Sequence, residues 1–138
     1  MNIKILFATT IAFLLPITVL PKGAIAGFFK DKTVECYFFK GENLVLQDTC
    51  KSDGASWAGG GGHSLKWSDG VVTSIRFGDQ SRGVSGCRNR SQNWVDGKCG
   101  ATYSRSAKTL KRIDERGENS INCVQLDRKS VCWGGWRD

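Results

Sequence analysis

Six cysteines, all downstream of residue 26, constrain the fold of this chain more than any other feature. An even number of cysteines in a short exported chain predicts a disulfide framework, because an oxidising compartment favours bridges over free thiols. The chain has one histidine, His63, and no C-x-x-C pair, so a zinc site is not expected. We expect three disulfides, no metal and no cofactor. The cysteines are Cys36, Cys50, Cys87, Cys99, Cys123 and Cys132.

The first 26 residues have the order of segments that is typical of a secretory signal peptide. Lys4 supplies a positive charge, an apolar run follows, and Ala24-Ile25-Ala26 forms a small-x-small cleavage site. Pro16 interrupts the apolar run, whereas a membrane anchor needs about 20 uninterrupted apolar residues. We therefore expect cleavage after Ala26 and a secreted chain, periplasmic or extracellular, with no transmembrane anchor. A single domain is expected over residues 27–138.

Apolar residues recur with a period of two, which favours short antiparallel strands joined by tight turns. The predicted fold class is all-β: a small antiparallel sheet or barrel-like domain of short hairpins, stabilised by disulfides. The segment 51–62 contains four consecutive glycines and is predicted to be an irregular loop. The segment 106–116 is ambiguous, because Ala107, Leu110 and Ile113 also fit one face of a short helix.

The segment 64–77 predicts a hairpin whose register follows from its apolar residues. A three-residue loop at Ser68-Asp69-Gly70 pairs Trp67 with Val71 and keeps the apolar residues on one face. Gly70 is then expected in the left-handed region, and His63 lies opposite Ile75 on the apolar face.

The preferred disulfide pairing is sequential, because each bridge then closes a short loop. A two-residue turn at Asp127-Arg128 would place Cys123 and Cys132 directly opposite each other, close enough for a bridge. A turn at Gly41-Glu42-Asn43 would place Cys50 opposite Val34, so the first bridge needs a bulge or bend. The predicted pairs are Cys36–Cys50, Cys87–Cys99 and Cys123–Cys132.

The second bridge conflicts with a repeated turn. The sequence Trp94-Val95-Asp96-Gly97 is similar to Trp67-Ser68-Asp69-Gly70, and the same hairpin would place Cys99 opposite Asn93. Cys87 would then lie roughly 20 Å away along an extended strand. Either residues 87–93 fold back or this pairing is wrong.

The excess positive charge is concentrated in one part of the sequence. The whole chain has a net charge of +7, and residues 76–116 hold ten Lys or Arg against four acidic residues. Such a stretch with interleaved aromatic residues is typical of surfaces that bind polyanions. For an exported chain we expect an anionic glycan or polymer, or a secreted protein, as the partner, and no nucleic acid. The candidate binding residues are Arg76, Arg82, Arg88, Arg90, Trp94, Arg105, Lys108, Lys111 and Arg112.

Catalysis is not expected from this sequence. His63, Ser64 and Asp69 are close in sequence, but the members of a catalytic triad must converge in space, and His63 falls on the predicted apolar face. The predicted function is a non-catalytic binding or envelope-associated module. The alternatives are an inhibitor of a secreted hydrolase, which would insert a rigid loop at 57–63, and a purely structural role.

Two segments resemble small secreted proteins of photosynthetic bacteria that have no assigned activity. The first runs from Cys36-Tyr-Phe-Phe-Lys-Gly41 through Cys50 to the Gly-rich segment 58–75, and the second comprises Ile121-Asn-Cys123 and Ser130-Val-Cys-Trp133. The shared residues are Cys, Gly and Trp, which serve structure. The resemblance implies export and a disulfide-stabilised β fold, and it transfers no functional residue.

Overall fold

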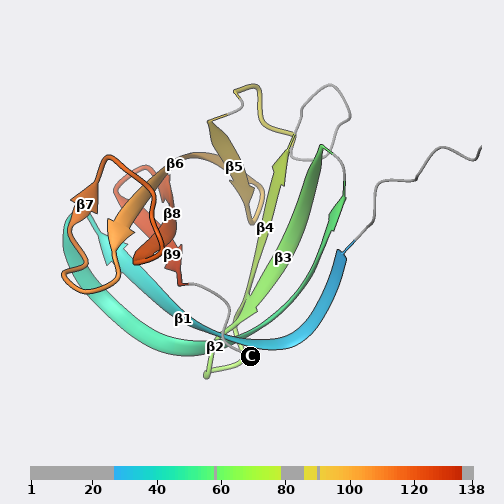
Figure 1. The fold of residues 1–138 in the computed structure, drawn as a ribbon, viewed down its shortest axis with the longest axis horizontal. Coiled ribbons are helices and arrows are strands. Elements are labelled where there is room, and N and C mark those ends of the chain that lie inside the picture. The colour runs from blue at the N-terminus through green and yellow to red at the C-terminus, as the bar shows by residue number, and fades with distance from the viewer. Residues whose placement is uncertain (1–26, 58, 79–85, 90, 135–138) are drawn as a thin grey trace, which may run out of the picture.

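The computed structural model describes residues 27–57, 59–78, 86–89 and 91–134, which form a closed eight-stranded antiparallel barrel (Figure 1). From β1 to β6 each strand pairs with the next along the chain, β6 pairs with β8 and β8 with β9, and β9 returns to pair with β1, which closes the ring. The short β7 pairs with β6 outside the ring. The strands are β1 (Gly27–Lys40), β2 (Asn43–Trp57), β3 (Gly60–Lys66), β4 (Val72–Gly78), β5 (Gln92–Val95), β6 (Lys98–Ser106), β7 (Arg112–Ile113), β8 (Ser120–Leu126) and β9 (Lys129–Trp133).

The prediction of an all-β, barrel-like domain is confirmed, whereas the alternative of a helix over 106–116 is wrong. Ser106 begins one helical turn, in which its carbonyl accepts a hydrogen bond from the Leu110 amide at 2.8 Å. Leu110 then adopts a φ of 59°, a left-handed conformation that a right-handed helix does not contain. The chain turns back there and forms β7.

The predicted loop over 51–62 is also wrong, because β2 continues to Trp57 and β3 begins at Gly60. The glycines are needed for close packing within these strands. A Cβ on Gly54 would lie 2.5 Å from Phe29 Cζ and 2.7 Å from His63 Cβ. A Cβ on Gly61 would lie 2.7 Å from Phe77 Cζ. Residues 60–63 therefore belong to β3 and do not form an irregular loop.

The predicted register of the first Asp-Gly hairpin is confirmed. Leu65 pairs with Thr73 and His63 pairs with Ile75, and Gly70 has a φ of 86°. The second Asp-Gly hairpin has a different register. Asp96 and Gly97 both have positive φ, at 44° and 92°, and they form a two-residue turn that places Cys99 opposite Trp94 instead of Asn93.

All three predicted disulfides are present. Cys123 and Cys132 are directly opposite each other across β8 and β9, with Cα atoms 4.1 Å apart. Cys50 lies opposite Val34, as predicted, and bridges diagonally to Cys36 over a Cα distance of 6.0 Å. Cys87 bridges to Cys99 over a Cα distance of 5.6 Å, so Cys87 lies beside the start of β6 and not at a distance along an extended strand. Bridges of this kind are typical of proteins outside the reducing cytosol.

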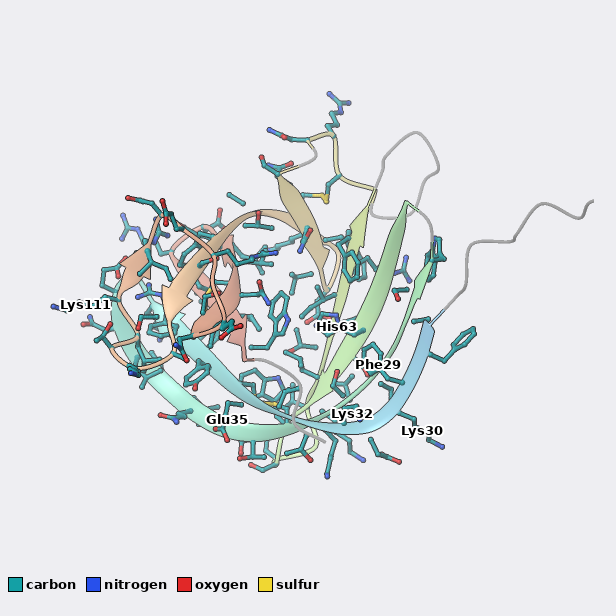
Figure 2. The ribbon with its side chains drawn as sticks, viewed as in Figure 1. Phe29, Lys30, Lys32, Glu35, His63 and Lys111 are labelled. Carbon is teal, nitrogen blue, oxygen red and sulfur yellow. A yellow bond between two sulfur atoms is a disulfide. The ribbon has the colours of Figure 1, made fainter. Side chains whose placement is uncertain are left out.

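Inward-facing side chains fill the middle of the barrel and separate its two ends. His63 and Leu65 on β3, and Trp67 directly after it, point inward in succession, and the middle residue, Leu65, is fully buried. The same order holds for Phe77, Ile75 and Thr73 on β4, and for Asn122, Val124 and Leu126 on β8. Leu65, Ile75, Val124, Val34 and the Cys36–Cys50 bridge thus form the central layer. Figure 2 shows His63 inside the barrel.

The expected signal peptide lies outside the described residues. Within the part of the chain that the structure describes, no helix has the length and apolar character needed to cross a membrane.

The close packing at Gly54 gives a stability prediction. We expect Gly54→Ala to lower the free energy of unfolding by about 2 kcal/mol, because the new methyl group overlaps backbone and core atoms. Gly117→Ala is the matched control, since a Cβ there meets no atom within 4 Å. Urea unfolding of both variants measures the difference. Equal effects would contradict this account of the glycines.

Burial of His63 gives a pH prediction. Burial lowers the pKa of His63 from 6.5 to about 4, so between these values the unfolded chain binds a proton that the folded chain does not. Stability from this group is therefore complete above pH 6.5 and falls as the pH drops toward 4, by about 3 kcal/mol. A His63→Gln variant should show a flatter unfolding free energy across this window. Unchanged slopes would contradict the prediction.

Candidate functional site

An apolar cavity of about 610 Å³ opens at one end of the barrel. Residues from the β3–β4, β5–β6 and β8–β9 turns line it, so we call this end the turn end. The volume lies within the range of about 300–1,000 Å³ that is usual for small-molecule sites, and the mouths of β-barrels are common positions for them. The residues of the central layer do not line this cavity and lie deeper in the barrel.

The cavity walls are aliphatic and aromatic side chains from β1, β2, β5, β8 and β9 and from the β3–β4 connection. Trp67 is held in place because its indole Nε1 donates a hydrogen bond to Thr73 Oγ1 at 3.0 Å. That bond satisfies the polar atom of the ring, so the indole presents an apolar surface. The apolar wall residues are Phe38, Leu46, Trp67, Val71, Val95, Leu126 and Val131.

Charged side chains surround the mouth of the cavity. Lys98 and Lys129 occupy inward-facing positions of β6 and β9, because Gly100 and Val131 two residues later face the interior. Arg128 lies in the adjoining turn. Within the described part of the chain, none of these three cations has a carboxylate within ion-pair distance.

The three aspartates at the mouth lie in hairpin turns, and two of them are engaged by the backbone. Asp69 Oδ1 accepts a hydrogen bond from the Val71 amide at 2.9 Å. Asp96 Oδ1 accepts one from the Ser74 amide at 2.7 Å. Part of their negative charge is thus already compensated by backbone donors, whereas the cations of the mouth remain available.

One side of the mouth is an exposed aliphatic lip. A bulge in β2 at Val45 turns Leu46 toward the cavity, opposite Phe38, and leaves Leu44 on the outer face, opposite Phe39. Leu46 is 45% exposed and Val71 is 56% exposed, although both line the cavity. We call the exposed residues Val45, Leu46, Val71 and Val72 the lip, whereas the exposed Leu44 lies outside it on the outer face.

The lip can be exposed because β2 lacks its second neighbour here. Pairing between β2 and β3 begins at Lys51, so residues 43–50 of β2 pair with β1 alone. A side chain replaces the missing strand contact, since Asp48 Oδ2 accepts a hydrogen bond from the Ser68 amide at 2.8 Å. That bond lowers the pKa of Asp48.

Two of the predicted basic residues, Arg76 and Arg112, lie on the outer wall of the barrel, each stacked on an aromatic ring. The guanidinium of Arg76 stacks on the ring of Trp94, 4.6 Å from its centroid. The guanidinium of Arg112 stacks on Tyr103, 3.9 Å from its centroid. Arg88, Lys108 and Lys111 are exposed, and Lys111 points outward in Figure 2. Arg82 and Arg90 lie outside the described residues. Binding of a polyanion at this wall stays a prediction.

Arg105 does not belong to that surface, which corrects the sequence prediction. It is only 1% exposed and lies on the outer face of β6 beneath the segment that connects β6 to β8. Its Nη1 donates hydrogen bonds to Glu42 Oε2 at 2.9 Å and to the Leu110 carbonyl at 2.8 Å. Its guanidinium also lies 4.1 Å from the centroid of Phe39. Arg105 therefore organises a small outer core.

The residues that suggested a triad do not converge. His63 faces the barrel interior, whereas strand alternation turns Ser64 to the outer face. Asp69 lies in the β3–β4 turn, with one carboxylate oxygen bonded to Val71. Among the described residues, no cluster of three or more His, Cys, Asp and Glu side chains could hold a metal ion.

The wall of the cavity and its two lysines, Lys98 and Lys129, were not predicted from the sequence. The alternation of inward and outward residues along each strand could have identified the lysines. Lys98 and Lys129 directly follow hairpin turns, and each is an even number of residues from interior residues of its own strand. This pattern identifies cavity residues only if the sheet is known to close, because the same alternation occurs in a flat sheet with one buried face.

The burial of Arg105 predicts that this residue contributes to the stability of the fold and not to a binding surface. We expect Arg105→Ala to lower the free energy of unfolding by about 3 kcal/mol, because it removes packing against Phe39 and leaves the Leu110 carbonyl without its donor. Lys108→Ala, an exposed control on the same connection, should change it by less than about 0.5 kcal/mol. Thermal or urea unfolding measures both, and equal values would refute the role given to Arg105.

Comparison of this chain with protein-family models, with curated proteins and with solved structures finds no match.

Proposed function

We propose that this chain is a secreted, non-catalytic binding protein for a small amphipathic molecule, with an apolar body and an anionic head. The body would occupy the apolar cavity, and the head would lie at the mouth between Lys98 and Lys129. The observation that carries this proposal is an apolar cavity inside a closed barrel, with two lysines at inward-facing positions of its mouth that have no carboxylate partner among the described residues.

The apolar body follows from the wall chemistry. Transfer of apolar surface from water into such a cavity is favourable by about 25 cal/mol per Å². The walls below the mouth offer apolar side chains and few hydrogen-bonding groups, and Trp67 has its N–H bonded to Thr73. A polar or charged body would lose its hydration there without replacement.

The anionic head follows from the charges at the mouth. Lys98, Arg128 and Lys129 have no carboxylate partner among the described residues, whereas Asp69 and Asp96 accept backbone hydrogen bonds. A carboxylate or a similar group therefore finds donors, while a cationic head would compete with these lysines. The exposed lip gives the ligand an apolar route from the surface into the cavity.

Blocking the cavity tests the apolar part of the proposal. Wild-type protein should bind dodecanoate, as measured by isothermal titration calorimetry. Leu46→Trp places a large ring in the cavity and should weaken binding at least tenfold. Leu44→Trp is the matched control, because Leu44 is 41% exposed on the same strand but faces outward, and it should bind as wild type does. Equal loss in both variants, or no binding by wild type, would refute the proposal.

Removing the lysine charges at the mouth tests whether they bind the anionic head, and a second variant tests whether the outer wall binds it instead. The double variant Lys98→Gln/Lys129→Gln should weaken dodecanoate binding about fivefold, since exposed charge pairs contribute up to about 1 kcal/mol each. Dodecanol, which has no charge, should bind both proteins alike. Arg76→Gln/Arg112→Gln changes the outer wall alone and should leave dodecanoate binding unchanged. If the outer-wall variant weakens binding instead, the anion site lies there.

A further inference from the structure

A second cavity, of about 520 Å³, lies at the opposite end of the barrel. It shares no lining residue with the apolar cavity, because Leu65, Ile75 and Val124 of the central layer lie between them. Its chemistry is different. The walls combine rings with amide and hydroxyl groups, and the turn aspartates and mouth lysines of the other end are absent from its described lining.

Four rings enclose this second cavity: Phe29, His63, Phe77 and Trp133. The His63 ring meets Trp133 edge-on with centroids 5.0 Å apart, and it lies 6.3 Å from the centroid of Phe77. Rings in such tilted arrangements are held by packing and offer flat faces to a planar guest. Figure 2 shows Phe29 on the early part of β1 and His63 inside the barrel.

Asn122 supplies the specific polar feature of this cavity. It is inward-facing on β8, and its Oδ1 is buried without a hydrogen-bond partner in the described structure. Its backbone pairs with Ser104 and Trp133, so the position of the side chain is fixed by two neighbouring strands. A buried amide oxygen of this kind is rare in folded proteins, because it loses hydration without compensation.

The charges near Asn122 favour a neutral guest. His63 is buried, which lowers its pKa to about 4, so its ring is uncharged at neutral pH. Thr102 Oγ1 already donates to the Ser91 carbonyl at 3.0 Å and is not available to Asn122 as a donor. Arg116 is the charged residue of the described lining, and it is exposed.

We infer that this second cavity is a binding site for a neutral planar aromatic molecule that donates an N–H or O–H hydrogen bond to Asn122 Oδ1. The rings of Trp133, Phe77 and His63 would contact the faces and edges of the guest. This site is separate from the cavity proposed for the amphipathic ligand. A protein that fails to bind dodecanoate can therefore still bind an aromatic molecule in the second cavity.

Indole and benzofuran form a matched pair of probes, because they share a planar bicyclic shape and differ in the N–H donor. Titration of the full mature protein, followed by NMR, should shift the resonances of the Trp133 indole and the His63 imidazole. We expect indole to bind with a Kd below about 1 mM and at least tenfold more tightly than benzofuran, since a site built around a polar group rejects analogues that lack the partner.

Two variants test whether indole bonds to Asn122 and whether it occupies the second cavity. Asn122→Leu removes the acceptor and should weaken indole binding about tenfold while leaving benzofuran binding unchanged or tighter. Leu46→Trp blocks the other cavity and should leave indole binding intact. Should Asn122→Leu fail to fold, the ratio of indole to benzofuran affinity in wild type decides. Equal affinities, shifts at Trp67 and Val95 instead, or no shift at about 10 mM indole would overturn the inference.

Discussion

Pairing of β1 with β9, from Cys36 opposite Trp133 to Lys40 opposite Lys129, closes the sheet into a barrel. This seam joins strands from the two ends of the described chain, so its closure has the largest entropic cost of any strand pair in the fold. Two disulfides hold the strands on either side of it. Cys36–Cys50 joins β1 to β2, and Cys123–Cys132 joins β9 to β8. Each short bridge contributes about 3 kcal/mol by restricting the unfolded chain. The seam therefore lies between two strand pairs, each of which is covalently linked.

Closure also determines where the apolar side chains are placed. In a ring of eight strands the interior is just wide enough to be filled by side chains or to hold one small ligand. This chain does both, because the central layer of Leu65, Ile75 and Val124 fills the middle and leaves the ends hollow. A second, outer core stabilises the opposite face of the same strands. Phe39, Tyr103 and the buried Arg105 form it under the connection between β6 and β8.

The sequence predicted the local features of this fold better than its closure or its site. The hairpin at Asp69-Gly70 and the turn at Asp127-Arg128 were predictable, because apolar parity and turn chemistry act over a few residues. The strand at 60–63 was not, since the need for glycine comes from Phe77 and from the neighbouring strand. Arg105 was misplaced for a related reason. Its charge is visible in the sequence, but Glu42, its partner, lies 63 residues away along the chain. Charge that is clustered in the sequence is here divided between the outer wall and the outer core.

The two ends of the barrel differ because their connections differ. At the turn end, hairpins of two or three residues place Asp69, Asp96 and Asp127 at the rim, and the next inward residues, such as Val95 and Leu126, are aliphatic. At the other end the inward positions of the same strands are Asn93 and Asn122, beside the rings of Phe77 and Trp133. One strand thus contributes an aliphatic residue to one cavity and an amide to the other. A single barrel with this alternation presents two chemically distinct interiors, and the packed central layer keeps a ligand at one end from contacting the other.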